Sequence, residues 1–220
     1  MNVTLDNVTI NVDEGYQHGY DPNAYKTAVS VTGSGNTNIE LNGNNTLTSG
    51  YGHAGLEHNK TDDSGTLTIQ DEKNDDDSAK GSASDTTGSL TAKGGFGGAG
   101  IGAGTLNDGQ VTITGGTINA TGNNGGAGIG GAGNQSNGTY YTGDGDVTIT
   151  GGTITATGGK MAAGIGGGAY GDGNVTITGG DITAKGNDKG AGIGGGMGSK
   201  TNGTVSSLSL IHISEPTRRR

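Results

Sequence analysis

Short stretches in which apolar and polar residues alternate recur along the chain and predict many short β-strands. In the most regular stretches, Val and Ile alternate with Thr, so that Val111 and Ile113 face inward while Thr112 and Thr114 face solvent. The same Val-Thr-Ile-Thr string starts at positions 111, 147 and 175. Each copy is therefore expected to be a half-buried strand.

Two further strings complete a repeat of three strands. Ala-Gly-Ile-Gly recurs with its Ile at 101, 129, 165 and 193, and Gly-Gly-Thr/Asp-Ile-Asn/Thr-Ala occupies 115–120, 151–156 and 179–184. Ile101 and Ile129 lie 28 positions apart, as do Ile165 and Ile193, whereas Ile129 and Ile165 lie 36 apart. The eight extra residues, around 134–144, should bulge outward at a turn without breaking the stack, as insertions in solenoids do.

A weaker form of the pattern extends upstream. First strands are expected at 39–41 and 67–69, second strands at 46–47 and 89–90, a third strand at 54–56, and an earlier coil from 8–10 and 28–31. Val205 begins a further first strand. The sequence thus predicts an all-β protein, a right-handed single-stranded parallel β-helix (β-solenoid) with about six coils of about 28 residues and three short strands each.

The composition suits a narrow core. Hydrophobic residues make up 28% and aromatic residues 4% of 220 residues, alongside 51 Gly. This is too little apolar side chain for a wide core, but enough for one filled by every second strand residue. Glycine serves tight corners, which need positive φ. Regularly spaced Val and Ile argue against disorder, and the absence of Cys excludes disulfides and thiolate metal sites.

The last residues break the pattern. The stretch from Leu208 to Arg218 resembles the translation of a transposase sequencing adapter, and 218–220 holds every Arg of the chain. The alternative is an amphipathic tail whose basic end contacts membrane or nucleic acid. We therefore expect a β-helix domain over residues 1–207, truncated at both ends, and a non-native tail over 208–220.

Charge narrows the choice of partners. The chain carries 12 Lys+Arg and 21 Asp+Glu; without the three Arg and Glu215 of the tail, 9 Lys face 20 acidic residues, a net charge near −11. An acidic body without Arg argues against nucleic-acid binding, which needs clustered basic residues. No apolar run approaches the about 18 residues that span a membrane, and Met1 opens without a signal peptide.

Three Gly-rich segments carry a resemblance. Residues 45–56, 89–102 and 125–131, the last reading Gly-Gly-Ala-Gly-Ile-Gly-Gly, resemble the Gly-rich β-helical surface proteins of Gram-positive anaerobic bacteria, over nearly all of 1–207. The resemblance implies an extracellular or cell-wall location, with a secretion signal, a wall anchor and neighbouring immunoglobulin-like or carbohydrate-binding modules elsewhere in such proteins. It implies no set of catalytic residues.

The few aromatic residues are the candidate ligand-binding residues. Tyr51 and Phe96 each lie five positions before a third-strand apolar residue, with Tyr25 roughly in line, which predicts a column at one corner. A second patch is expected at another turn, from Tyr140, Tyr141 and Tyr170. Such rings could pack against the C–H faces of sugars; alternatively, they cap the core.

The sequence gives weaker support for a catalytic, metal-binding or ice-binding site. The acidic residues of 62–77 crowd an irregular stretch, which is typical of a solvated loop, and strand positions that a hydrolase or lyase would use carry Thr, Asn and Ser. His53 and His58 are five residues apart across a turn, which is poor metal-ligand spacing. Outward Thr pairs such as 112/114, 148/150 and 176/178 could form an ice-binding ladder, although Thr is common on any strand surface.

These observations favour a non-catalytic, secreted or cell-surface β-helix that acts as a structural stalk or adhesin. The alternative is a polysaccharide-binding module that uses the turn aromatics, with an extracellular polysaccharide or a cell-surface glycan as partner. An ice-binding Thr array and a polysaccharide lyase or hydrolase are less favoured. No cofactor and no metal is expected.

Overall fold

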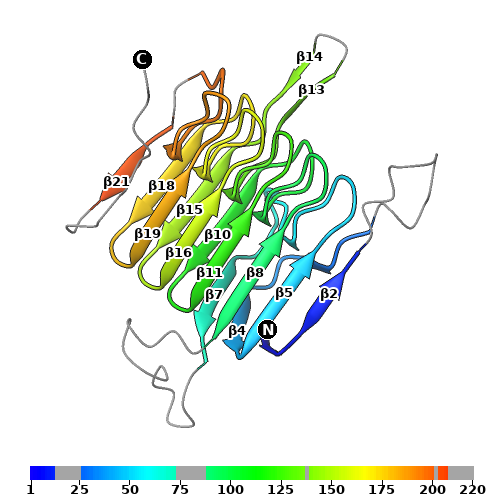
Figure 1. Cartoon of the computed structure of the whole chain (residues 1–220), viewed down its shortest axis with the longest axis vertical. Helices are drawn as coiled ribbons and strands as arrows, with labels where there is room; N and C mark the ends of the chain where they lie inside the picture. The colour runs from blue at the N-terminus through cyan, green and yellow to red at the C-terminus, as the bar shows by residue number, and fades with distance from the viewer. Residues whose placement is uncertain (13–25, 73–87, 137–138, 201–202, 208–220) are drawn as a thin grey trace.

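The chain winds into a stack of coils, and each coil contributes one strand to each of three parallel sheets (Figure 1). The computed structural model describes residues 1–12, 26–72, 88–136, 139–200 and 203–207. Every pairing between neighbouring coils in these sheets is parallel. The predicted all-β, right-handed parallel β-helix is confirmed.

The three sheets have similar strand numbers but different strand lengths. The first sheet contains β1 (Asn2–Asp6), β4 (Thr37–Asn42), β7 (Leu67–Asp71), β10 (Gly109–Ile113), β15 (Gly145–Ile149), β18 (Gly173–Ile177) and β21 (Val205–Ser207). The second contains β2 (Thr9–Asn11), β5 (Asn44–Thr48), β8 (Ser89–Lys93), β11 (Thr117–Thr121), β16 (Thr153–Thr157) and β19 (Asp181–Lys185). The third contains the two-residue strands β3 (Val29–Ser30), β6 (Leu56–Glu57), β9 (Ile101–Gly102), β12 (Ile129–Gly130), β17 (Ile165–Gly166) and β20 (Ile193–Gly194).

The core is a narrow column of aliphatic side chains. Val111 and Ile113 of β10 are 1% and 0% exposed, while Thr112 between them reaches the surface, as the alternation predicts. The register places like on like, since Ile113 pairs with Ile149 of the next coil. Each fully buried aliphatic side chain contributes about 1.5–3 kcal/mol, so many small contributions along the axis replace one wide core.

The strand assignments from sequence hold, with one addition. The predicted first coil had only its second and third strands; the structure adds β1 as its first strand, in which Leu5 is 7% exposed. Val205 does begin a further first strand, β21, which pairs with β18. The described residues therefore form six three-strand coils and the first strand of a seventh.

The eight-residue insertion forms a hairpin. The outward bulge predicted at this turn is confirmed. β13 (Asn134–Ser136) and β14 (Thr139–Tyr141) pair antiparallel and project from the stack (Figure 1). Below them, β10 and β15 pair in unbroken register from Gly109↔Gly145 to Ile113↔Ile149. The hairpin is thus added to a corner without disturbing the coils.

Glycine is required where the coils turn most tightly. At the end of β12, Gly130 has φ 130°, and a Cβ there would lie 2.1 Å from the carbonyl oxygen of Gly166 in the next coil. Only glycine combines this φ with such close backbone approach. The Gly that follows Ile in the repeated Ala-Gly-Ile-Gly string is therefore a structural requirement.

Candidate functional site

The predicted aromatic column consists of one stacked pair. Tyr51 and Phe96 lie at the corner between the second and third sheets, with ring centroids 5.1 Å apart and an angle of 7° between the rings. The backbone is joined there too, since Gly52 N donates to Phe96 O at 2.9 Å. Because the two rings cover one another, a sugar could stack only on the outer face of either ring or meet the ring edges.

The column does not continue along the stack. The positions five residues before Ile129, Ile165 and Ile193 hold Asn124, Lys160 and Asp188. Tyr25, predicted to lie in line with the pair, is outside the described residues. The pair is partly open to solvent, since Phe96 is 38% exposed.

The second predicted aromatic patch comprises two tyrosines of the hairpin and one at the corner of the following coil. Tyr140 and Tyr141 lie in β14, opposite Gln135 and Asn134, and Tyr141 is 41% exposed. Tyr170 lies at the corner after β17, with φ 62° and its hydroxyl 3.7 Å from the sulfur of Met161. The structure thus places these tyrosines at the third-to-first corners, as predicted.

A cleft of about 440 Å³ opens beside Tyr170. Thr142 at the base of the hairpin lines it together with Tyr170, Met197, Gly198 and Lys200. The wall thus comes from three successive corners of the stack. Met197 and Lys200 were not among the candidate residues from sequence, because Met197 stands in a glycine run and Lys200 beyond the last regular repeat.

The two aromatic patches lie along the same edge of the stack. Thr105, in the corner after β9, donates its backbone N–H to Gly52 O at 2.8 Å, next to Tyr51. In the same way Met197 N donates to Met161 O at 2.8 Å. The corners on either side of the short third sheet therefore pack on each other. The sequence predicted the two aromatic groups at separate turns and gave no sign of this contact.

A buried polar group lies near the start of the stack. Glu57, 6% exposed, accepts hydrogen bonds from Ala54 N at 3.1 Å and Asn59 Nδ2 at 3.2 Å, and its Oε2 lies 2.8 Å from His53 Nδ1. His58, 1% exposed, has Nδ1 3.2 Å from Val31 O and Nε2 2.9 Å from Gly65 O. Both imidazoles are held by protein groups within the frame.

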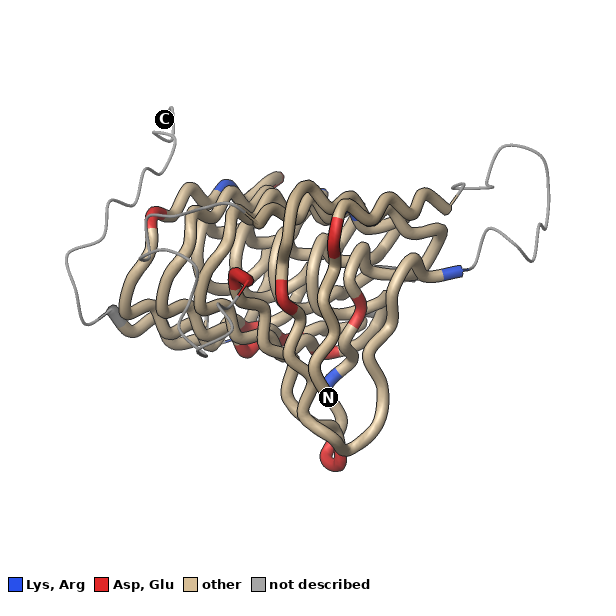
Figure 2. Tube along the Cα trace, turned by 90° about the horizontal axis from the view of Figure 1, so that it is seen from below, with Lys and Arg blue, Asp and Glu red and all other residues tan. Residues whose placement is uncertain are grey.

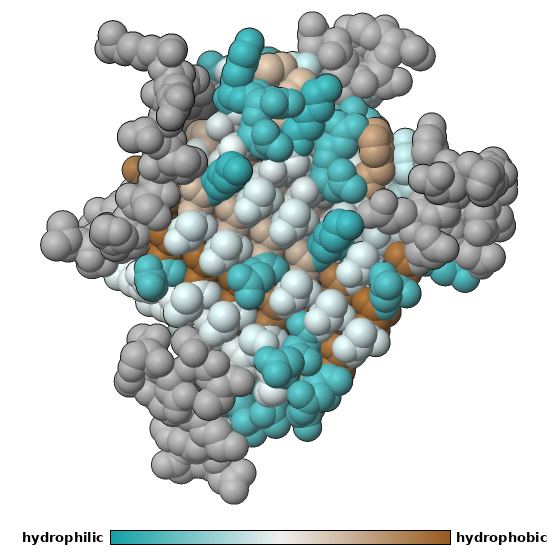
Figure 3. All heavy atoms as spheres, in the orientation of Figure 1, coloured by the Kyte–Doolittle hydropathy of each residue, from teal (hydrophilic) through white to brown (hydrophobic). Residues whose placement is uncertain are grey.

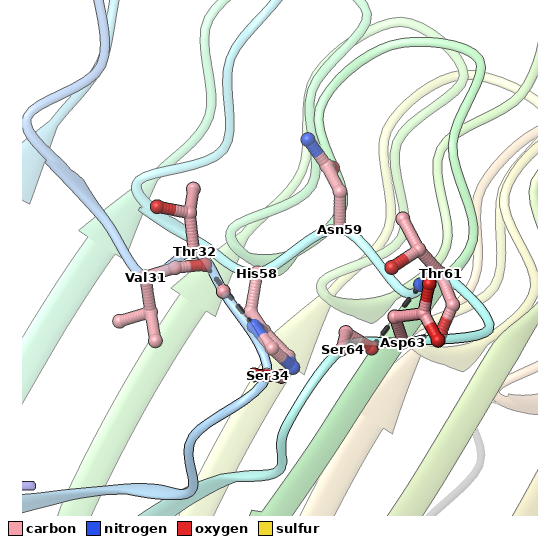
Figure 4. A pocket seen from close by; sticks show the side chains of 9 residues that line it. Val31, Thr32, Ser34, His58, Asn59, Thr61, Asp63 and Ser64 are labelled. Carbon is pink, nitrogen blue, oxygen red and sulfur yellow. Dashed lines mark hydrogen bonds between the residues drawn. The ribbon is translucent and has the colours of Figure 1, made fainter.

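A pocket of about 270 Å³ lies against His58 (Figure 4). Asn59 and Ser64, two other polar residues of its lining, also have internal partners. Asn59 Oδ1 accepts from Gly104 N at 2.8 Å, and Ser64 Oγ both accepts from Thr61 N at 3.1 Å and donates to Thr61 O at 3.0 Å. These lining groups therefore help to fix the 58–66 connection. Within the described residues no group of three or more His, Cys, Asp or Glu could hold a metal ion.

Aspartates form a ladder at the turn before the first sheet. Asp108 Oδ1 accepts from Asp144 N at 2.7 Å, and Asp144 Oδ1 accepts from Asp172 N at 2.8 Å. Burial raises the pKa of the Asp144 carboxyl, and the charges of Asp108 and Asp172 raise it further, against the opposing effect of the hydrogen bond from Asp172. The three Asp residues thus join successive turns by hydrogen bonds from backbone N–H groups to carboxylates.

An ion pair crosses the coils next to this ladder. Lys60, in the connection from β6 to β7, pairs with Asp146 of β15, and Asn174 Nδ2 donates to the same carboxylate at 3.0 Å. The hydrogen bond to Asp146 raises the pKa of Lys60. Burial raises the pKa of Asp146, but the hydrogen bonds from Lys60 and Asn174 outweigh it and leave that pKa lowered. Figure 2 shows acidic positions on neighbouring coils.

One acidic residue differs from the solvated-loop interpretation of 62–77. Asp71 is the last residue of β7 and is 7% exposed, and its Oδ1 accepts from Gly88 N at 3.1 Å. It therefore joins β7 to the start of the second sheet. Asp75, Asp76 and Asp77 lie outside the described residues.

The Thr ladder predicted on the first sheet is present, and the second sheet carries a more exposed one. Thr112, Thr148 and Thr176 pair in register and are partly exposed, and of the second members of the predicted pairs Thr114 and Thr150 are exposed and Thr178 partly exposed. On the second sheet a row of mostly Thr side chains is exposed, from Thr91 through Asn119 and Thr155 to Thr183. Figure 3 shows pale, weakly polar side chains in rows across the face turned to the viewer.

Comparison with known proteins agrees with the architecture. Three segments match the family described as Beta helix repeat, over residues 111–133, 147–169 and 175–197. These are the three most regular coils, and with the sheet topology they identify a β-helix repeat protein. Neither the curated proteins nor the solved structures gave a match to the chain. The described part of the chain has no helix long and apolar enough to cross a membrane.

Proposed function

We propose that the chain is a non-catalytic β-helix module of a secreted or cell-surface protein, which acts as a structural stalk or an adhesive surface. One observation carries the proposal. Among the described residues, buried or partly buried carboxylates and imidazoles such as Glu57, His58 and Asp144 are bound to backbone and side-chain groups of the frame. Groups held in this way link coils and are poor candidates for a proton-transfer step on a substrate.

The architecture supports a presenting role. Parallel pairing along the axis makes a stiff rod whose corners accept additions, as the β13–β14 hairpin demonstrates. An acidic, Thr-rich surface is well hydrated, which suits an extracellular location. The partner class we propose is an extracellular polysaccharide or a cell-surface glycan.

Incubation of the full chain with pectin-like and other acidic polysaccharides tests the non-catalytic role. We expect no release of reducing ends or unsaturated products. Turnover that an Asp→Asn or Glu→Gln substitution abolishes would overturn the proposal.

A polysaccharide-binding module is the second candidate, and the cleft beside Tyr170 favours it. A glycan array with the full chain would detect such binding. A Tyr51→Ala/Phe96→Ala double variant reports whether the stacked pair contributes. If wild type binds no glycan, this second candidate is wrong, whereas a stalk function stands.

A further inference from the structure

The cleft beside Tyr170 combines groups that a sugar site uses. An aromatic ring, Tyr170, a flexible apolar side chain, Met197, and a hydroxyl, Thr142, line a hollow of about 440 Å³. Small-ligand sites have volumes of about 300–1,000 Å³, with mostly apolar walls and a few polar groups. Lys200 adds the one cationic side chain of this lining.

Tyr170 occupies a backbone position that suits glycine. It lies four residues after Gly166 with φ 62°, and the residue at the same place in the next coil is Gly198, with φ 78°. A bulky residue in this left-handed region is uncommon and costs free energy, and such residues cluster at functional sites. Leu106 holds the equivalent position two coils earlier with φ 67°, so the left-handed conformation alone does not mark a site, and what distinguishes Tyr170 is the aromatic ring that it adds to the cleft.

The ring is held in place by its neighbours. A Cβ on Gly198 would lie 2.7 Å from Tyr170 Cδ1, so the ring packs directly on the Gly198 backbone. The Tyr170 hydroxyl reaches the sulfur of Met161, and Tyr170 N donates to Met197 O at 3.0 Å. A ring fixed on a rigid corner is a preorganised platform, which lowers the entropy cost of binding.

The positive charge of Lys200 favours an acidic sugar over a neutral one. No described residue forms an ion pair with Lys200, so its ammonium can meet an anion. A pyranose ring packs its C–H face on an aromatic surface, and a carboxylate on that ring pairs with an ammonium. We propose that the Thr142–Tyr170–Met197–Lys200 cleft binds a uronic acid residue of an acidic polysaccharide, an assignment that rests on the adhesive form of the proposed function.

Calorimetry of the full chain with a galacturonic acid trisaccharide tests the site, and the trisaccharide reduced at its carboxyl groups to the neutral sugar is the ligand control. We expect wild type to prefer the acidic trisaccharide. Tyr170→Gly removes the ring and matches the backbone to Gly198, so the fold is kept while affinity falls by about tenfold or more. Lys200→Gln should remove the preference for the acidic ligand, and Lys200→Arg should keep it.

Leu106→Gly is the matched control, because Leu106 lies at the equivalent corner two coils earlier, with φ 67° and 46% exposed. It should leave binding unchanged. If wild type binds acidic glycans on the array but Tyr170→Gly binds as tightly, the cleft assignment is wrong while the adhesive function stands. Equal affinity for both trisaccharides, or binding only of an acidic peptide, would also overturn the assignment. If wild type binds no glycan at all, both fail.

Discussion

The aspartate ladder yields a prediction in which charge can be removed without removing a hydrogen bond. Asp144 Oδ1 accepts from Asp172 N at 2.8 Å, and Asp144 N donates to Asp108 Oδ1 at 2.7 Å. In Asp144→Asn the amide oxygen can accept the same bond. The substitution therefore isolates the cost of holding a partly buried carboxylate between two others.

The magnitude follows from the coil spacing. Neighbouring strands lie about 4.8 Å apart, and at that distance two like unit charges repel by about 0.9 kcal/mol in bulk water and about 3.5 kcal/mol at an effective dielectric constant of about 20. Because Asp144 is only partly buried, screening favours the lower value, which is within the range of about 0.2–1 kcal/mol that favourable cross-strand side-chain pairs contribute with the opposite sign. With two neighbours, we expect Asp144→Asn to stabilise the fold by about 1 kcal/mol at pH 7.

The pH dependence follows from the raised pKa of Asp144, caused first by burial and then by Asp108 and Asp172. A carboxyl whose folded-state pKa exceeds its unfolded value of about 3.9 carries no penalty below the unfolded pKa and the full penalty above the folded pKa. The stabilisation by Asp144→Asn should therefore vanish near pH 3. Urea unfolding followed by circular dichroism at both pH values measures it, with an expected midpoint shift at pH 7 of about 0.3–1 M.

The control is Asp181→Asn, since Asp181 is exposed on β19 and pairs with the uncharged Thr153. This variant should change the midpoint little. A midpoint for Asp144→Asn that is unchanged or lower at pH 7 would refute the repulsion argument. A gain of equal size at pH 3 would show that the effect does not come from charge.

Three further predictions concern the frame. Ile149→Ala removes a side chain with 0% exposure from the core, so the free energy of unfolding should fall by about 2–5 kcal/mol in urea titrations. Gly130→Ala places a methyl group 2.1 Å from Gly166 O at φ 130°, and a loss of soluble, folded protein on size-exclusion chromatography is expected. Deletion of residues 135–142 gives the corner the length of the one after β17, with Asn134 at the place of Tyr170; the far-UV spectrum should be kept and stability should change by less than about 1 kcal/mol. A collapse of the stack on deletion would contradict the view that the hairpin is an addition.

The stack could be predicted from sequence because its rule is local. Val111 and Ile113 alternate with Thr, and the same strings return after 28 positions, so strand direction, inward faces and the site of the insertion follow from spacing alone. The weaker coil at the start had only part of this signal. Val3-Thr-Leu5 alternates, but without the repeated string it did not identify β1.

The contacts between corners could not be predicted from the same rule. Lys60 pairs with Asp146, 86 positions away, because the long connection after β6 folds across the coils. Period and alternation describe what lies directly above a residue, not where an irregular connection goes. The adjacency of the corners around Thr105 and Gly52 has the same origin, since it depends on the short third sheet bringing its two ends together.

The repeat also explains where a specific site can arise. Packing restricts the side chains at core positions, and close backbone approach requires glycine at the tight corners. A substitution at either place therefore costs stability, whereas a substitution at an outer corner position is tolerated. Two departures from the repeat lie between β10 and β20. One is the hairpin, which ends near Thr142, and the other is Tyr170, at a corner position with a left-handed backbone conformation. They are separate in sequence, yet both line the same cleft. In a periodic scaffold whose regular positions serve the stack, the convergence of independent irregularities on one surface is itself a reason to test that surface first.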